Sequence, residues 1–231
     1  MATQVLRPER EALPPTMANL ITVIRLCLLF VVIFLIYRQP VDLALLNMIL
    51  IIVVFAGDGI DGWVARKRGE TSQFGAVFDI AGDRIVETAL WIIFADLKAI
   101  PIWVPLLVVV RGGVVDALRS LSYADGMTAF GAKNMMRSPI TTWLTAGRFM
   151  RGLYGYAKAA AFVFLTGYVG YMQPESAGTW LQTVYGQEWI RAFGWISVWL
   201  SVALMIIRGL PVIFDAMPYL RQESPKPDAK P

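Results

Sequence analysis

Apolar residues along the chain are gathered into long runs that short polar stretches separate. Each run is about as long as the roughly 20 residues that an α-helix needs to cross a bilayer. The runs cover positions 17–38, 41–67, 73–97, 101–122, 151–172 and 190–214. This pattern predicts an all-α integral membrane protein with six transmembrane helices.

Polar residues mark both ends of the chain and one internal segment. Residues 1–18 carry mixed charges and two adjacent prolines, which indicates an interfacial arm or short helix at the membrane face or, alternatively, a disordered terminus. The six helices would form one domain over 19–215, and the Pro- and Lys-rich stretch 216–231 would be a disordered tail. The polar segment 121–150 is long enough to hold a re-entrant or interfacial helix.

Composition narrows the chemistry that the chain can perform. Its 231 residues are 57% hydrophobic, have a mean hydropathy of +0.57, include no histidine and carry a net charge of +4. Catalysis and metal binding by histidine are therefore excluded. A single cysteine, Cys27, excludes a zinc cluster or an internal disulfide framework. The basic excess is modest, so we expect contact with anionic lipid and no nucleic-acid partner.

Four aspartates lie between two of the apolar runs. Asp58 and Asp61 are three residues apart and Asp79 and Asp83 are four apart, so each pair shares one face of a helix. A carboxylate at membrane depth costs a few kcal/mol, which makes it a candidate for function. Ligands that are all oxygen suit Mg²⁺, Mn²⁺ or Ca²⁺. We therefore predict one or two divalent ions between antiparallel helices; ion pairs within a helix bundle are the alternative.

Small residues and an arginine accompany these acids. Gly62, Ala65 and Gly75 leave room for a ligand or a neighbouring backbone to approach. Arg66 offers a fork of donors that matches phosphate oxygens. Carboxylates, a metal and an arginine together predict a diphosphate ligand.

The spacing of these positions resembles a known signature. The pattern Asp58-x2-Asp61-Gly62-x2-Ala65-Arg66-x8-Gly75-x3-Asp79-x3-Asp83 matches all eight fixed positions of the CDP-alcohol phosphotransferase family. The resemblance implies a homodimeric membrane enzyme that uses a CDP-linked lipid, most simply CDP-diacylglycerol, and releases CMP. It also implies Mg²⁺ or Mn²⁺, as two ions, held by Asp58, Asp61, Asp79 and Asp83.

Further roles follow from the same resemblance. Asp83 would also be the general base, Gly62, Ala65 and Gly75 would make room for cytidine, and Arg66 would hold the phosphates. Asn19, Thr22 and Arg25 resemble the family's N-x-x-T-x-x-R opening, whose end of the helix faces the nucleotide. The alternative for these three residues is a helix cap and a snorkelling arginine.

Basic residues in the second half of the chain predict a pocket for an acceptor that carries phosphate. Its candidates are Arg111, Arg119, Arg148, Arg151 and Lys158. Arg111 lies in an apolar helix, where an arginine should face a wet cavity, and Arg119 shares its face. The alternative for the cations near 133–151 is a solvated loop. For Arg84 and Glu87 we expect a local ion pair, or a glutamate that orients Asp83.

The acceptor is open between three alcohols. RGGVVDALRSL resembles the R-E-x5-L-R of phosphatidylglycerophosphate synthases, with Gly112 in place of the glutamate, and this favours glycerol-3-phosphate. The pair Asp83-Arg84 resembles inositol-type members and favours inositol phosphate, and phosphatidylglycerol, the acceptor in cardiolipin synthesis, is the third candidate. A divalent-cation transporter or a non-catalytic lipid-binding paralogue is the alternative from another class.

Lysine and arginine also predict an orientation. With the N-terminus inside, the loops at 66–72 and 121–150 and the tail are inside too, and these hold most of the basic residues. The opposite loops hold only Arg38, Lys98 and Arg191. The positive-inside rule therefore predicts that both termini and the acidic site face the cytoplasm.

Overall fold

The computed structural model describes residues 17–68, 73–124 and 138–221. The predicted arm therefore lies outside the described residues from position 1 to 16, and the predicted tail from 222 to 231. Within the described ranges every regular element is a helix, so the predicted all-α class is confirmed.

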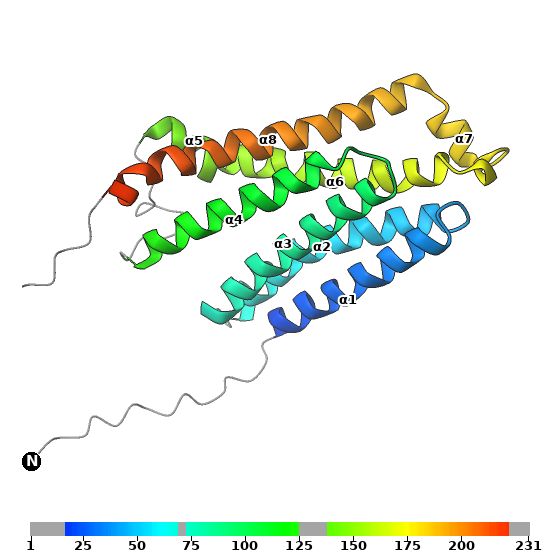
Figure 1. Cartoon of the computed structure of the whole chain (residues 1–231). Coiled ribbons are helices and arrows are strands. Elements are labelled where there is room, and N and C mark those ends of the chain that lie inside the picture. Colours follow the sequence, from blue (N-terminus) through cyan, green and yellow to red (C-terminus); the bar gives the residue numbers. More distant parts are fainter. Residues whose placement is uncertain (1–16, 69–72, 125–137, 222–231) are drawn as a thin grey trace, which may run out of the picture.

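Six long helices run alternately up and down a bundle (Figure 1). They are α1 (Met17–Arg38), α2 (Ala44–Arg68), α3 (Gln73–Asp96), α4 (Trp103–Ala124), α6 (Arg148–Tyr171) and α8 (Glu188–Arg221). All six correspond to predicted helices, although α8 continues past the predicted boundary at position 215. Because six long helices alternate in direction, α1 begins and α8 ends at the same end of the bundle (Figure 1).

Shorter helices lie at both ends of the bundle. The predicted polar segment 121–150 contains α5 (Pro139–Ala146), which packs against α6 and α8. Ser138 caps α5 by accepting a hydrogen bond from the Ile140 amide, and Thr141 completes the capping box. At the opposite end, η1 (Pro174–Ser176) and α7 (Trp180–Tyr185) connect α6 to α8.

Membrane crossing is supported for part of the bundle. Two of the described helices, over Asn19–Arg38 and Glu188–Asp215, are long and apolar enough to span a bilayer, and Ala44–Ile60 is a shorter apolar helix. Charged residues in α3, α4 and α6 lower the hydropathy of the remaining helices. The six-span topology therefore stays a prediction.

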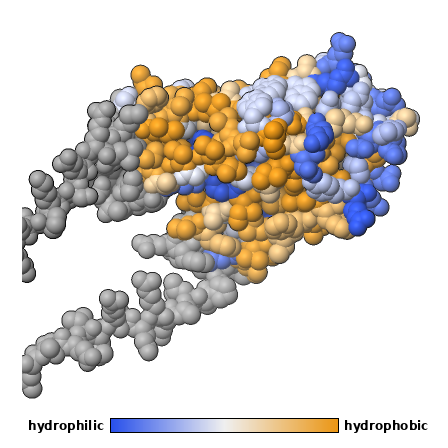
Figure 2. Space-filling model, in the orientation of Figure 1, coloured by the Kyte–Doolittle hydropathy of each residue, from blue (hydrophilic) through white to orange (hydrophobic). Residues whose placement is uncertain are grey.

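The outer surface of the bundle is largely apolar. Hydrophobic side chains cover the side of the bundle that Figure 2 shows, and polar residues gather at the end where α7 lies. Phe30 and Phe34, for example, leave 62% and 58% of their area exposed. Soluble monomers rarely expose contiguous apolar surface of this extent. The surface thus supports the prediction that lipid surrounds the helices.

An aromatic core holds three of the helices together. The Phe162 ring of α6 lies 4.7 Å from Trp91 and 6.0 Å from Phe94 of α3, and 5.5 Å from Phe55 of α2. Aromatic pairs at these distances add to the gain from burial. Since Phe55 lies one turn before Asp58, this core fixes the part of α2 that carries the acidic motif.

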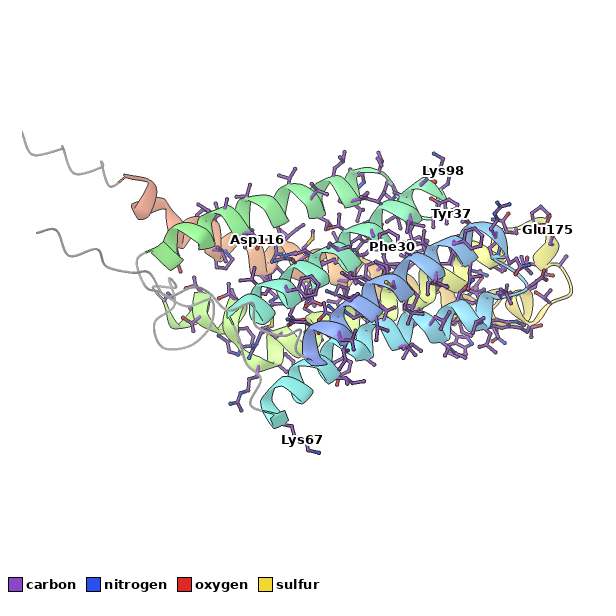
Figure 3. The ribbon with its side chains drawn as sticks, turned by 90° about the horizontal axis from the view of Figure 1, so that it is seen from below. Phe30, Tyr37, Lys67, Lys98, Asp116 and Glu175 are labelled. Atoms are coloured by element: carbon purple, nitrogen blue, oxygen red, sulfur yellow. The ribbon has the colours of Figure 1, made fainter. Side chains whose placement is uncertain are left out.

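Helix α1 is linked to α3 at two levels. At one level the Tyr37 hydroxyl donates to Asp96 Oδ2 at 2.6 Å, and at the other Arg25 donates to Asp83. The link through Tyr37 lies at the end of the bundle where Lys98 and Glu175 also lie, and Lys67 is at the other end (Figure 3). These two links hold α1 beside α3 along the face where the aspartates lie.

Candidate active site

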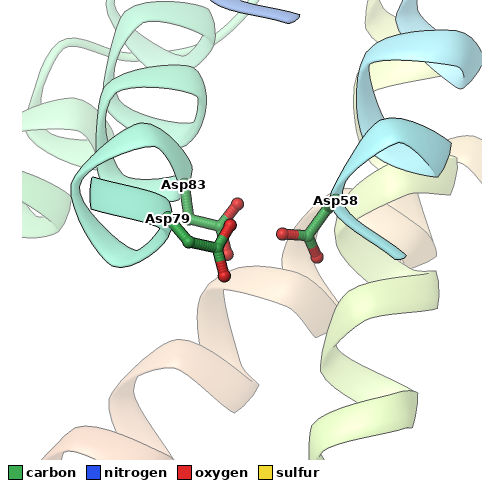
Figure 4. Close-up of side chains that lie close together, drawn as sticks. All are labelled: Asp58, Asp79 and Asp83. Atoms are coloured by element: carbon green, nitrogen blue, oxygen red, sulfur yellow. The ribbon is translucent and has the colours of Figure 1, made fainter. Parts of the chain in front are cut away.

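Three carboxylates meet where α2 faces α3. Asp58 on α2 and Asp79 and Asp83 on α3 each offer an oxygen, and these oxygens lie within 4.8 Å of one another (Figure 4). This is the predicted meeting of acids from two antiparallel helices. The backbone of Asp61 belongs to α2, but its side chain lies outside the described residues, so its role stays a prediction.

A buried arginine from α1 joins the three acids. Arg25 is only 3% exposed, and it donates from Nη1 to Asp58 and from Nη2 to Asp83, both at 2.9 Å. Its Nη2 also lies 3.8 Å from an oxygen of Asp79. The guanidinium offsets carboxylate charge that would otherwise be costly. The alternative of a snorkelling Arg25 is therefore wrong, because the side chain points into the bundle and is covered.

Two glycines make this arrangement of Arg25 feasible. A Cβ at Gly82 would lie 2.9 Å from Cγ2 of Thr22 and 3.1 Å from Nη2 of Arg25, and one at Gly57 would lie 3.2 Å from Cδ of Arg25. The prediction singled out other glycines and missed these two. A signal was present, because each of the two directly precedes an aspartate of the motif.

A cavity of about 580 Å³ opens beside the carboxylates. Its polar wall comprises Arg25, Asp58, Asp83 and Lys158, and its apolar wall includes Ile52, Phe55 and Val86. Tyr156 and Ile52 also line it and are 81% and 52% exposed, so the cavity reaches the outer surface between α6 and α2. The space therefore combines a charged end with an apolar flank that faces outward.

A second polar cluster fills the bundle between α3, α4, α6 and α8. Glu87 is buried, and it accepts hydrogen bonds from the Tyr154 hydroxyl and from Lys158 Nζ, the latter at 3.2 Å. Arg84 lies 3.8 Å from Glu87 and donates two hydrogen bonds to Asp116, at 3.2 and 3.3 Å. The expected ion pair of Arg84 with Glu87 is thus present, but the stronger partner of Arg84 is Asp116.

Two more arginines complete the second polar cluster. The Arg208 guanidinium of α8 lies 5.1 Å from the centre of the Tyr154 ring and donates to the Thr145 carbonyl at 3.0 Å. Arg111 of α4 packs against Gly209, and its buried Nε has no hydrogen-bond partner among the described residues. Arg208 was not predicted, although an arginine far inside the last apolar run was a usable signal.

The predicted acceptor residues are only partly brought together. Arg111 and Lys158 belong to the second polar cluster, whereas Arg148 and Arg151 are both exposed at the start of α6. The Arg119 side chain lies outside the described residues.

The predicted nucleotide residues lie near the carboxylates as far as the structure describes them. Thr22 is buried beside Gly82, Asn19 lies one turn before Thr22, and Gly75 lies on the first turn of α3. The side chains of Ala65 and Arg66, and the surroundings of Gly62, fall outside the described residues. Their roles stay predictions.

The three-carboxylate site fits a hard divalent cation by its donors. All of its ligand atoms are carboxylate oxygens, which suit Mg²⁺, Mn²⁺ and Ca²⁺ and not softer metals. Arg25 shares the oxygens of Asp58 and Asp83 that such an ion would use. A bound cation would therefore compete with Arg25 for these oxygens.

Comparison with known proteins agrees with this geometry. A family model described as CDP-alcohol phosphatidyltransferase matches residues 15–207. A Mycobacterium tuberculosis (strain ATCC 25618 / H37Rv) protein named "Putative cardiolipin synthase" is 24% identical over 205 residues, which are 85% of this chain and 86% of the relative.

Two further relatives match over shorter stretches. A Bacillus subtilis (strain 168) protein named "CDP-diacylglycerol--glycerol-3-phosphate 3-phosphatidyltransferase" is 30% identical over 99 residues, 43% of this chain and 50% of the relative. An Arabidopsis thaliana protein named "CDP-diacylglycerol--inositol 3-phosphatidyltransferase 1" is 32% identical over 94 residues, 39% of this chain and 38% of the relative. Because the family model spans well over half of the chain and includes the three gathered aspartates, this protein belongs to the CDP-alcohol phosphatidyltransferase family.

Proposed function

We propose that this protein transfers a phosphatidyl group from CDP-diacylglycerol to a phosphorylated alcohol, with glycerol-3-phosphate as the first choice, and releases CMP. The observation that carries the proposal is the meeting of Asp58, Asp79 and Asp83 beside a cavity that Asp58 and Asp83 line and whose apolar flank reaches the outer surface. A lipid with a diphosphate headgroup has the same division into a charged end and apolar chains. It would enter sideways from the bilayer with its headgroup toward the carboxylates.

The reaction follows from the groups at the charged end. The acceptor hydroxyl oxygen forms a bond to the phosphorus that carries diacylglycerol, and the bond from that phosphorus to the bridging oxygen breaks. The bridging oxygen leaves with CMP. Asp83 takes the hydroxyl proton, because it lines the cavity and the chain has no histidine to serve as base.

Asp58, Asp79 and Asp83, together with Asp61 as a predicted ligand, would hold Mg²⁺ or Mn²⁺. When bound, such an ion neutralises the diphosphate and stabilises the charge that develops on the leaving group. Arg25 supplies positive charge on the α1 side of the same carboxylates.

The second polar cluster supports an acceptor that carries phosphate. Four cations, Arg84, Arg111, Lys158 and Arg208, lie in that cluster together with the acids Glu87 and Asp116. Arg111 makes neither a hydrogen bond nor an ion pair with the part of the chain that the structure describes. A half-buried guanidinium without such partners is suited to bind an anion, since a phosphate would supply the missing hydrogen-bond acceptors.

Two other acceptors are supported by the relatives. The relative named as a putative cardiolipin synthase matches over most of both chains, which favours phosphatidylglycerol as a second candidate. The inositol-type relative supports inositol phosphate, as does the pair Asp83-Arg84.

The test is CMP release by the purified full chain with CDP-diacylglycerol and Mg²⁺ or Mn²⁺. Glycerol-3-phosphate, inositol phosphate, inositol, phosphatidylglycerol and no acceptor would be compared side by side. We expect the highest kcat/KM with glycerol-3-phosphate. A higher kcat/KM with phosphatidylglycerol would make that lipid the acceptor in place of glycerol-3-phosphate and would leave the reaction class unchanged. No CMP with any alcohol would refute the proposed enzyme and favour a transporter or a non-catalytic lipid-binding protein.

A further inference from the structure

Glu87 is a buried acid inside the bundle. Among the acidic side chains that the structure describes it alone is buried, with 3% of its area exposed. It lies one turn beyond Asp83 on α3, but its hydrogen bonds go to α6, from Tyr154 to Oε1 and from Lys158 to Oε2. A buried carboxylate is costly unless it is hydrogen-bonded and paired, and here both conditions are met. The proposed reaction gives Glu87 no role so far.

Lys158 connects Glu87 to the cavity. Its ammonium lies 5.7 Å from the centre of the Phe55 ring and 5.1 Å from that of Tyr154, and the same side chain lines the cavity beside Asp58 and Asp83. A lysine has a flexible four-carbon stem and a compact charge, so its position depends on what holds it. Glu87 is the acid that holds this one, at 3.2 Å.

Tyr154 connects Glu87 to a second cation. One oxygen of Glu87 accepts from the Tyr154 hydroxyl, while the ring of Tyr154 lies 5.1 Å from the Arg208 guanidinium. Glu87 thus holds Lys158 directly, whereas Arg208 contacts the tyrosine ring and is also held by the Thr145 carbonyl at 3.0 Å. Arg84 needs Glu87 less, because Asp116 already satisfies it with two hydrogen bonds.

We propose that Glu87 is a positioning residue that holds Lys158 where its ammonium can bind the phosphate of the acceptor. The inference rests on the proposed function and extends it, because it assigns a negatively charged residue to the construction of an anion site. The carboxylate does not touch the substrate. It holds Lys158, which lines the cavity, and without it Lys158 would turn toward the aspartates that line the same cavity.

The test compares kinetic constants for both substrates in Glu87→Gln and in the wild-type chain. Glutamine keeps the size of the side chain and an acceptor for Tyr154 but removes the charge that holds Lys158. We expect the KM for the phosphorylated acceptor to rise about tenfold, as for the loss of one charge-assisted contact, with the KM for CDP-diacylglycerol and kcat within about twofold. Glu175→Gln, the same change at an exposed position at the far end of the bundle, is the matched control and should behave as wild type.

A double-mutant cycle separates positioning from a general effect on the fold. If Glu87 acts through Lys158, then Glu87→Gln should change the acceptor KM much less in a Lys158→Met background than in the wild type. The inference would be overturned if Glu87→Gln changed the acceptor KM equally in both backgrounds, or left it unchanged in the wild-type background. In either case, turnover by the wild type would leave the proposed function standing. An equal loss for donor and acceptor together with a lower unfolding temperature would assign Glu87 a structural role only. No CMP from the wild type would refute the proposed function and this inference with it.

Discussion

At the scale of single residues, the molecule balances acids against arginines in two adjacent places. Asp58, Asp79 and Asp83 gather around Arg25, and Glu87 lies among cations of the second polar cluster. Periodicity predicted the first gathering, because each pair of aspartates shares a helix face. The partner of Asp58 and Asp83 was not predictable in this way, since Arg25 lies 33 and 58 residues away from them in sequence.

The base assignment gives a prediction for Asp83. Asparagine keeps the shape of the side chain but cannot take the proton of the acceptor hydroxyl. We expect Asp83→Asn to lower kcat by about 10²- to 10⁴-fold, the usual contribution of a general base, without loss of the folded state. Turnover would be measured as CMP release, and folding by the thermal unfolding midpoint in detergent. A variant that keeps a near-normal rate would show that another group takes the proton.

Arg25 gives a prediction about metal affinity. Since Arg25 and a cation share oxygens of Asp58 and Asp83, Arg25→Met should bind Mn²⁺ more tightly and be less stable without it. A tenfold gain in affinity adds about 1.4 kcal/mol to the stabilisation by saturating metal.

The measurement for Arg25 is the rise in unfolding temperature on adding Mn²⁺, which should be larger in Arg25→Met than in wild type. Arg38→Met, at an exposed position near the opposite end of α1, is the control. Equal rises in all three proteins would contradict the competition.

At the scale of elements, helix existence was predictable and close helix packing was not. All six long helices follow from runs of apolar residues, with boundaries displaced by a few positions. How closely α1 approaches α2 and α3 depends on Gly57 and Gly82, which a hydropathy pattern treats like any other small residue. The short α5 was predictable only as a helix somewhere in a polar segment, because its capping by Ser138 depends on local geometry.

Gly82 gives a prediction at this scale. An alanine there would place a Cβ 2.9 Å from Cγ2 of Thr22 and 3.1 Å from Nη2 of Arg25, so these side chains or α1 itself must move. We expect Gly82→Ala to destabilise the protein by about 1–3 kcal/mol, as overpacking does, and to reduce turnover because Arg25 moves. Gly113→Ala is the matched control: Gly113 lies in α4, where an added Cβ would meet open space, so this change should be neutral or slightly stabilising. The check is the unfolding free energy of each variant; equal values would contradict the close approach.

At the scale of the whole molecule, the helices alternate in direction. The second half of α2 and the first half of α3, which carry the three aspartates, lie toward the end where α1 begins and α8 ends (Figure 1). The distribution of lysine and arginine predicts that this end faces the cytoplasm. A soluble acceptor would then reach the cavity from the cytoplasm, while the lipid donor would arrive from the bilayer.

Labelling in cells tests this orientation. In a background with Cys27→Ser, single cysteines replace Lys67 at one end of the bundle and Glu175 at the other (Figure 3). We expect a membrane-impermeant maleimide to label Glu175→Cys in intact cells and Lys67→Cys only after permeabilisation. The reverse pattern would place the site on the outside and would refute the predicted topology.

The central claim is that the carboxylates between α2 and α3 hold a divalent cation and activate a CDP-linked lipid. It is tested most directly by CMP release from CDP-diacylglycerol after treatment with EDTA and titration with free Mg²⁺ or Mn²⁺. The account predicts that turnover is lost in EDTA, returns saturably with metal in the wild type, and needs far more metal in Asp79→Asn. Full turnover in EDTA, or the same metal dependence in Asp79→Asn as in the wild type, would contradict it.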